Sequence, residues 1–274
     1  MILADSGTLD IFYPLIIVAG VILILVIFDF FLKKKNCKKG LSTDYEIFFV
    51  VCVFIGVIFA CLFQNLYDFI ENPSTYKWNF GLTFFGGLFG GVATFFIGYY
   101  LVMRRKYPYA WPYIVSIVGG MIPLAHGIGR LGCVIDGCCY GKVIEEGSPF
   151  YWLGMVFSTT NGQKVYPTQL WESIFLILLS IGLIILAFKK ETLLTVPIYF
   201  MSYGIFRFLI EFIRDDHRGS FVPGLTPSQF WAVCLFIGGV GYLLYLILAK
   251  RVFIKDWPHY EEMLKTTEKE NPSK

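Results

Sequence analysis

The amino-acid sequence predicts an all-α integral membrane protein with seven transmembrane helices. Of its 274 residues, 56% are hydrophobic and only 16% are charged, whereas a soluble domain is about half apolar and a quarter charged. The apolar runs reach about 20 residues, which is enough for a helix to cross the bilayer core. Lysine and arginine are concentrated in alternate connections between these runs, as expected of a chain that crosses the membrane repeatedly.

The distribution of basic residues orients the expected spans. These spans cover residues 12–32, 46–69, 80–102, 110–127, 168–188, 192–213 and 227–249. The connections after the first, third and fifth spans, together with the C-terminal tail, hold sixteen lysines and arginines, against six in the opposite connections. The positive-inside rule therefore predicts an outer N-terminus and a cytoplasmic C-terminus. We expect a membrane domain over 1–250, with an outer-side loop region at 128–167 between spans four and five, and a cytoplasmic tail at 251–274.

The charge pattern also argues against two other interpretations. Asp5 and Asp10 precede the first apolar run and a lysine-rich segment follows it, which is the reverse of a cleavable signal peptide. The net charge of +3 is small, and no basic stripe accompanies a nucleic-acid-binding motif. Nucleic acid is therefore not an expected partner.

The segment 125–141 holds the densest group of polar and reactive side chains beside a membrane span. If the fourth helix continues into it, helical spacing places four positions on one face: His126, Arg130, Cys133 and Gly137. The intervening glycines could instead end the helix. An arginine guanidinium suits a phosphate because its fork forms two parallel hydrogen bonds. The alternative is that Arg130 reaches the lipid head groups from a helix end.

Three cysteines in this segment leave several kinds of chemistry open. Cys133 and Cys138 could form a disulfide on an oxidising face, or one thiol could be reactive because Arg130 lies close by. A purely structural role is a third alternative. A metal site is the least favoured, because the spacing of Cys133, Cys138 and Cys139 is not that of a common zinc site. We therefore expect neither a metal nor a cofactor.

A second charged stripe lies in the sixth span. Helical spacing places on one face Tyr203, Arg207, Glu211 and Arg214. An unpaired cation inside a span is strongly disfavoured, and Glu211 is the natural helical neighbour of Arg207. The stripe therefore predicts either a structural ion pair or, together with Arg130, a site for an anionic ligand near the outer leaflet.

Two further patterns have structural explanations beside functional ones. At the start of the fifth span, Thr168 could cap the helix and Glu172 suits its first turn. In the third span, glycines repeat every four residues at 86, 87, 90 and 91, a pattern that lets another helix, or a lipid, pack closely.

In their order along the chain, these clusters resemble the prolipoprotein diacylglyceryl transferase family. The family run Gly-Arg-x-Gly-Asn-x-x-Asn-Gly-Glu-x-x-Gly aligns with 129–141, where the shared residues are Gly129, Arg130, Gly132, Gly137 and Gly141. Its Pro-Ser-Gln-Leu-Tyr-Glu motif is similar to 167–172, with Gln169 and Glu172 retained. Its Tyr-Gly-x-x-Arg-Phe-x-x-Glu-Phe-x-Arg run matches the stripe in span six, and Tyr13 is similar to a tyrosine near the family's N-terminus.

The chain also departs from the family pattern. The family's His-Gly-Gly-Leu motif reads Phe85, Gly86, Gly87 and Leu88 here, so its histidine is absent. The two hallmark asparagines are replaced by Cys133 and Asp136, and the hallmark glutamate by Cys138. The resemblance therefore implies a divergent, cysteine-rich member with a rebuilt site.

The resemblance implies a transferase of the bacterial inner membrane. Its donor would be phosphatidylglycerol, and its acceptor the cysteine thiol in the signal peptide of an exported prolipoprotein. Arg130 and Arg207 would stabilise the leaving phosphate. The substrate-binding positions would be Tyr13, Gly86, Gly87, Gly129, Gly132, Asp136, Gly137, Gly141, Gln169, Glu172, Tyr203, Glu211 and Arg214.

Two hypotheses concern the missing histidine. In the first, His126 replaces it as the base that deprotonates the acceptor thiol; the alternative is that Arg130 lowers the pKa of that thiol and no dedicated base is needed. In the second, Cys133 or Cys138 is a covalent nucleophile that carries the lipid group before passing it on. The alternatives to the main interpretation are a paralogue that transfers a lipid group to another acceptor, a non-catalytic lipid-binding membrane protein and, least favoured because no paired broken spans occur, a small-solute transporter.

Overall fold

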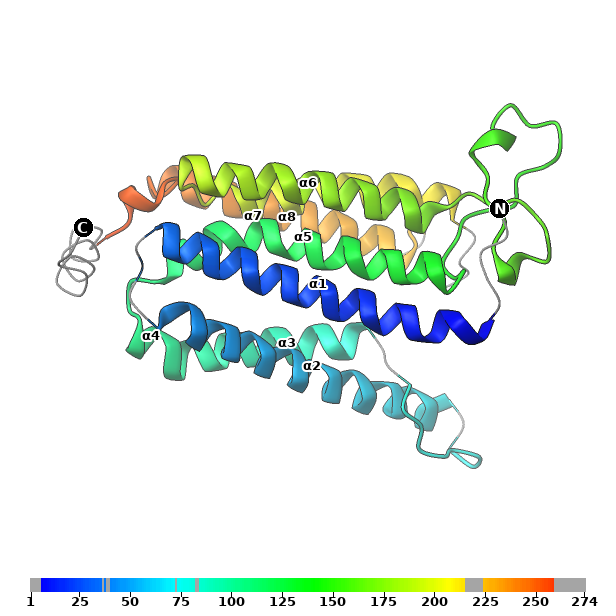
Figure 1. Ribbon diagram of the computed structural model, residues 1–274, viewed down its shortest axis with the longest axis horizontal. Helices are drawn as coiled ribbons and strands as arrows, with labels where there is room; N and C mark the ends of the chain where they lie inside the picture. Colours follow the sequence, from blue (N-terminus) through cyan, green and yellow to red (C-terminus); the bar gives the residue numbers. More distant parts are fainter. Residues whose placement is uncertain are drawn as a thin grey trace. The chain divides into compact units, whose positions relative to one another are not determined.

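A computed structural model describes residues 6–35, 37, 40–71, 73–81, 84–214 and 224–258 (Figure 1). The long elements among these residues are helices, and β-structure is limited to isolated bridges among them. The chain forms two compact units, of which the first contains Met1–Phe28 and Pro112–Tyr260 and the second contains Asp29–Trp111 and Glu261–Lys274.

The first unit is built from long apolar helices. It contains most of α1 (Ser6–Lys34), followed by α5 (Trp111–Ile135), α6 (Thr168–Lys190), α7 (Thr195–Ile210) and α8 (Pro227–Leu248). Small residues allow α5 and α6 to approach closely, since a Cβ at Gly120 would lie 2.8 Å from the side chain of Ile184. The Ser173 hydroxyl donates to the Gly127 carbonyl over 2.7 Å, and the interface therefore satisfies polar groups that lipid could not.

Shorter elements finish this unit at the end where α5 stops and α6 begins (Figure 1). The connection 136–167 contains the 3₁₀ turns η2 (Tyr151–Leu153) and η3 (Ser158–Thr160). Helix α7 continues into the 3₁₀ turn η4 (Glu211–Ile213). A bridge between Gly141 and Arg214 joins this turn to the connection. Beyond α8 lies one further 3₁₀ turn, η5 (Ile254–Asp256).

The second unit contains a tightly packed helix pair. Helix α2 (Leu41–Glu71) packs on α3 (Phe84–Gly98), which continues through the π-helical turn η1 (Tyr99–Met103) into α4 (Arg104–Lys106). A Cβ at Gly86 would lie 2.6 Å from the Phe59 carbonyl oxygen, so a larger residue there would force the helices apart. The close packing expected of the repeated glycines is thus confirmed.

The observed helices agree with the expected spans at most positions. Among the described residues, six helices are long and apolar enough to cross a membrane. In place of the expected span 80–102, α3, η1 and α4 follow one another from Phe84 to Lys106, and α3 alone has only 15 residues. Helix α5 ends at Ile135 rather than at 127. Its glycines do not end the helix, because packing and hydrogen bonding against α6 stabilise it there.

Candidate active site

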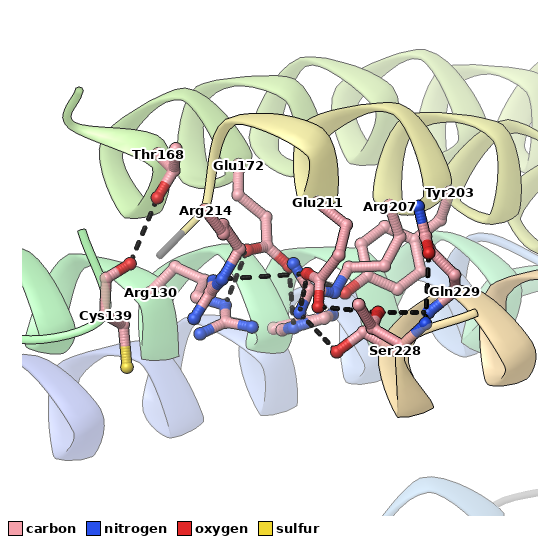
Figure 2. A network of polar contacts seen from close by, with 12 residues as sticks. Arg130, Cys139, Thr168, Glu172, Tyr203, Arg207, Glu211, Arg214, Ser228 and Gln229 are labelled. Carbon is pink, nitrogen blue, oxygen red and sulfur yellow. Dashed lines mark hydrogen bonds and ion pairs between the residues drawn. The ribbon is translucent and has the colours of Figure 1, made fainter. Parts of the chain in front are cut away.

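The site is organised around the carboxylate of Glu172, which is fully buried one turn into α6. Its Oε2 lies 3.0 Å from Nε of Arg130 on α5. Its Oε1 accepts a hydrogen bond of 2.7 Å from the Tyr203 hydroxyl on α7. His126 Nε2 lies 3.7 Å from the same Oε1, and its ring packs edge-on against Tyr203 with centroids 4.9 Å apart. One carboxylate thus connects three helices (Figure 2).

A second carboxylate, that of Glu211, organises the adjoining half of the network (Figure 2). Its Oε2 lies 3.0 Å from Arg207 Nη2, and its Oε1 accepts a hydrogen bond of 2.9 Å from the Thr226 hydroxyl. Arg207 Nη2 also donates to the Ser228 hydroxyl over 2.8 Å. The expected Arg207–Glu211 pair is therefore confirmed, and the start of α8 completes it.

Arg214 joins the two halves. Its Nε lies 3.7 Å from Glu211 Oε2, and its Nη1 lies 4.0 Å from Glu172 Oε2. The Arg214 side chain is only 1% exposed, whereas that of Arg130 is 18% and that of His126 is 25% exposed. A ligand that enters from outside therefore meets Arg130 and His126 first.

Besides the atoms that form the ion pairs above, two buried polar groups near this network have no hydrogen-bond partner among the described residues. They are the side-chain amide of Gln169, which is fully buried, and Nη1 of Arg207. Gln169 precedes Glu172 by one helical turn and so lies on the same side of α6. An unsatisfied buried polar group costs about 1–3 kcal/mol, and a polar ligand would remove that cost.

The end of α5 brings three thiols together. Gly137 has a φ of +62°, the Cys138 amide donates to the Cys133 carbonyl, and the Gly137 amide donates to the Val134 carbonyl. This is the Schellman arrangement that ends a helix and turns the chain back over its last turn. The sulfur atoms of Cys133, Cys138 and Cys139 lie within 4.8 Å of one another, and none of the three forms a disulfide.

Local charge acts on these thiols. Interactions with the thiols of Cys133 and Cys138 lower the pKa of the Cys139 thiol, and the positive charges of Arg214 and Arg130 act in the same direction. One group of the cluster is therefore prone to be a thiolate.

The capping role expected at 168–172 is wrong. Pro167, rather than Thr168, occupies the N-cap position of α6. The Thr168 hydroxyl instead donates to the Cys139 carbonyl over 3.1 Å (Figure 2). Glu172 points into the ion network and so does not act on the helix terminus. Tertiary contacts thus take both side chains away from the local roles that helix chemistry would assign.

The comparisons with known proteins agree with the motifs. A family model described as prolipoprotein diacylglyceryl transferase matches residues 3–245. The chain belongs to the prolipoprotein diacylglyceryl transferase family.

Curated relatives share most of their length with the chain. A phosphatidylglycerol–prolipoprotein diacylglyceryl transferase of Clostridium tetani is 29% identical, covering 83% of this chain and 90% of its own. Phosphatidylglycerol–prolipoprotein diacylglyceryl transferase 2 of Clostridium perfringens is 30% identical, and the match covers 86% of this chain and 90% of that protein. One from Francisella tularensis is 31% identical, with 73% and 71% covered. The predicted resemblance and transferase class are confirmed.

The structure places the family's glycines in different settings. A Cβ at Gly141 would lie 2.6 Å from the Ile213 carbonyl oxygen, so a close approach of two chain segments requires glycine there. Gly132 is buried within α5. A Cβ at Gly129 would meet nothing within 4 Å. Asp136, which follows α5, has an exposed side chain.

Some predicted site residues stay outside the network. Gly86 and Gly87 belong to the second unit, where they pack against α2. Tyr13 lies in α1, but its side chain is outside the described residues. Their roles in substrate binding stay predictions.

Sequence reasoning missed the contribution of α8. Thr226 and Gln229 form a capping box. The backbone N–H of Gln229 donates to the Thr226 hydroxyl, and the backbone N–H of Thr226 donates to the side-chain oxygen Oε1 of Gln229. The sequence Thr-Pro-Ser-Gln at 226–229 carries this signal, with proline at the first helical position. It did not reveal that Thr226 and Ser228 also bind Glu211 and Arg207.

Proposed function

We propose that the protein transfers the diacylglyceryl group of phosphatidylglycerol to the cysteine thiol in the signal peptide of an exported prolipoprotein. Membership of the family supports this proposal, as do the relatives, whose names give both substrates. The observation that carries it is the charge of the buried network.

The described part of the network contains more guanidinium groups than carboxylates. Arg130, Arg207 and Arg214 contribute three positive charges, and Glu172 and Glu211 contribute two negative ones. Guanidinium groups bind phosphate oxygens through paired hydrogen bonds, and the phosphodiester of phosphatidylglycerol carries a single negative charge. Arg130 is the partly exposed member that would bind it, and Arg207 Nη1 and the Gln169 amide supply further polar atoms.

The same network suits the reaction. The acceptor sulfur attacks the glyceryl carbon that bears the phosphate, so that a carbon–sulfur bond forms and the carbon–oxygen bond breaks. The diacylglyceryl thioether and glycerol phosphate are the products. Negative charge increases on the leaving phosphate, and preorganised guanidinium groups stabilise it more in the transition state than in the ground state.

The acceptor thiol loses its proton in this reaction, and His126 is the proposed base. Its ring is partly exposed, and Glu172 lies close enough to stabilise the imidazolium that forms. The Tyr203 hydroxyl is held by Glu172, so this carboxylate positions both aromatic rings. Arg130 lies one helical turn from His126. The base would therefore reach the acceptor thiol while Arg130 binds the phosphate of the lipid beside it.

The proposed setting is the plasma membrane of a bacterium, crossed seven times. The third crossing would use α3, η1 and α4 together, which form successive helical turns from Phe84 to Lys106. The connection 136–167 and the ion network would then lie on the outer side, where exported prolipoproteins are modified. Reporter fusions after Lys106 and after Lys190 test this orientation, because both should report the cytoplasmic side.

The decisive experiment supplies labelled phosphatidylglycerol and a peptide with a lipobox cysteine to the purified full-length protein in vesicles. We expect a diacylglyceryl thioether on the peptide and release of glycerol phosphate. Phosphatidylethanolamine, whose head group adds a positive charge, should be a poor donor. The matched control is Cys234→Ser, which alters an exposed thiol on α8. Lipid binding without either product would favour a non-catalytic lipid-binding protein.

Mass spectrometry separates direct from covalent transfer. If Cys133 or Cys138 carries the lipid group, a single turnover without peptide should leave a diacylglyceryl adduct on that residue. Glycerol phosphate formed only with peptide, and no adduct, would favour direct attack by the acceptor thiol.

A further inference from the structure

We propose that Cys133, Cys138 and Cys139 form a three-thiolate site for zinc, with a fourth coordination position open to an exogenous thiol. The cluster stands where the family motif has two of its polar side chains, and the ion network does not use it. It is the only such group of potential metal ligands among the described residues.

The spacing of the three sulfur atoms fits one small, thiophilic cation. A zinc–sulfur bond is about 2.3 Å long, so two sulfurs on one tetrahedral zinc are roughly 3.8 Å apart. All three sulfurs of the cluster already lie within 4.8 Å of one another. Small rotations of the side chains would therefore complete the site without any movement of α5.

The backbone explains how an uncommon cysteine spacing reaches this geometry. The turn at Gly137 reverses the chain at the end of α5. It brings Cys138 next to Cys133, whose carbonyl accepts a hydrogen bond from the Cys138 backbone N–H. Cys139 then takes the left-handed conformation, with a φ of +64°. Its carbonyl accepts the hydrogen bond from Thr168, and Figure 2 shows its sulfur on the side away from that bond. Contacts with α6 thus hold the third sulfur toward the other two.

Charge and access are also suitable. Three thiolates and one divalent zinc carry a net negative charge, and the guanidinium groups of Arg130 and Arg214 interact electrostatically with Cys139. All three cysteines are partly exposed, so an ion and a further ligand can reach them. Three protein ligands with one position left for an exogenous ligand are typical of catalytic rather than structural zinc sites.

The open position gives the site a role, and this step rests on the proposed function. A thiol that binds zinc loses its proton more readily, so a lipobox cysteine bound there would give its proton to His126, the proposed base, and be held as the thiolate that attacks the lipid. Cys133 lies one helical turn from Arg130, the proposed phosphate ligand. As zinc ligands, Cys133 and Cys138 would not carry a covalent lipid intermediate.

The test uses the full-length protein, purified under reducing conditions in detergent and stripped of metal. Zinc is titrated against a chromophoric chelator, and the protein is separately loaded with cobalt as a spectroscopic probe. We expect roughly one zinc ion per chain, and intense cobalt bands typical of tetrahedral thiolate coordination. Serine at any one of the three positions should weaken binding by more than the 10–100-fold that loss of an outer-shell partner causes.

Matched variants identify the thiols involved. A protein with serine at the other four cysteines, 37, 52, 61 and 234, should bind like the original chain. A protein that keeps only those four should not bind. Equal loss of zinc from both variants would overturn the site. A disulfide among the three thiols, sought by alkylating the extracted protein before any reductant is added, would also overturn it, as would a diacylglyceryl adduct on one of them.

The open position has its own readout. A lipobox peptide should change the cobalt spectrum, whereas the same peptide with serine in place of cysteine should not. No change with either peptide would overturn binding of the acceptor to the metal. These spectra do not depend on turnover, so an inactive protein that still binds cobalt would contradict the proposed function and leave the metal site standing.

Discussion

The Glu172 and Glu211 halves of the network have the same chemistry but different surroundings. Each carboxylate lies 3.0 Å from one guanidinium group, that of Arg130 or of Arg207. Around Glu211, Arg214 and the start of α8 supply the remaining contacts and leave little of the pair exposed. Around Glu172, the neighbours are the partly exposed Arg130 and His126. The Glu211 half therefore mainly holds helices together and offers a ligand only Arg207 Nη1, while the Glu172 half is more open to a ligand.

This contrast separates stability from turnover within one network. A pair that is almost fully buried affects stability mainly when it is broken, because the surviving charge stays buried without that partner. A partly exposed guanidinium group still has N–H donors that can bind an incoming anion. Mutations in the two halves should consequently affect different measurements.

The largest expected effect is on stability, from Glu211→Gln. The change removes the charged carboxylate that lies 3.0 Å from Arg207 and 3.7 Å from Arg214, and breaking a buried ion pair costs about 3–5 kcal/mol. We expect a marked fall in the free energy of unfolding, measured by denaturant titration in micelles. A protein as stable as the original would show that the Glu211 half does not support the helices.

The next effect concerns turnover, from His126→Ala. Loss of a general base lowers the rate by about 100-fold or more, with little change in stability because the ring is partly exposed. The defect should shrink as the pH rises toward the thiol pKa of about 8.5, since the acceptor then ionises without help. His126→Gln is the control for size and polarity, and should be equally slow. Full turnover by His126→Ala would refute the role.

A smaller effect should distinguish the two arginines. Arg130→Lys keeps the charge but loses the planar fork, and we expect the rate with phosphatidylglycerol to fall roughly tenfold while stability is maintained. Arg207→Lys also loses its hydrogen bond to Ser228, so it should lower stability more than Arg130→Lys does. Equal losses of stability in the two variants would remove the distinction between the halves.

The smallest effect should come from Ser228→Ala. It removes one hydrogen bond to Arg207, and a typical hydrogen bond contributes about 1 kcal/mol. We expect that loss in the free energy of unfolding, and a rate within about twofold of the original. A large loss of activity would mean that α8 takes part in the reaction itself.

The sequence alone predicted the helices and much of the candidate site. Runs of about 20 apolar residues specify membrane helices wherever they occur, and helical spacing was sufficient to place Arg207 beside Glu211. Membership of the family was readable from the glycines and arginines of two motifs. The extension of α5 to Ile135 was not, because three glycines weaken the helix locally and only its packing on α6 offsets them.

Which groups meet was decided by the tertiary structure. Local chemistry assigned Glu172 to its own helix terminus, yet the fold buries it where Arg130, Tyr203 and His126 converge. The gathering of the three thiols depends on the turn at Gly137 and on the contact between Cys139 and Thr168, which are far apart in the chain. Periodicity in a sequence determines which face of one helix a residue occupies. Only the packing of helices determines which charges must neutralise each other once lipid and protein exclude water.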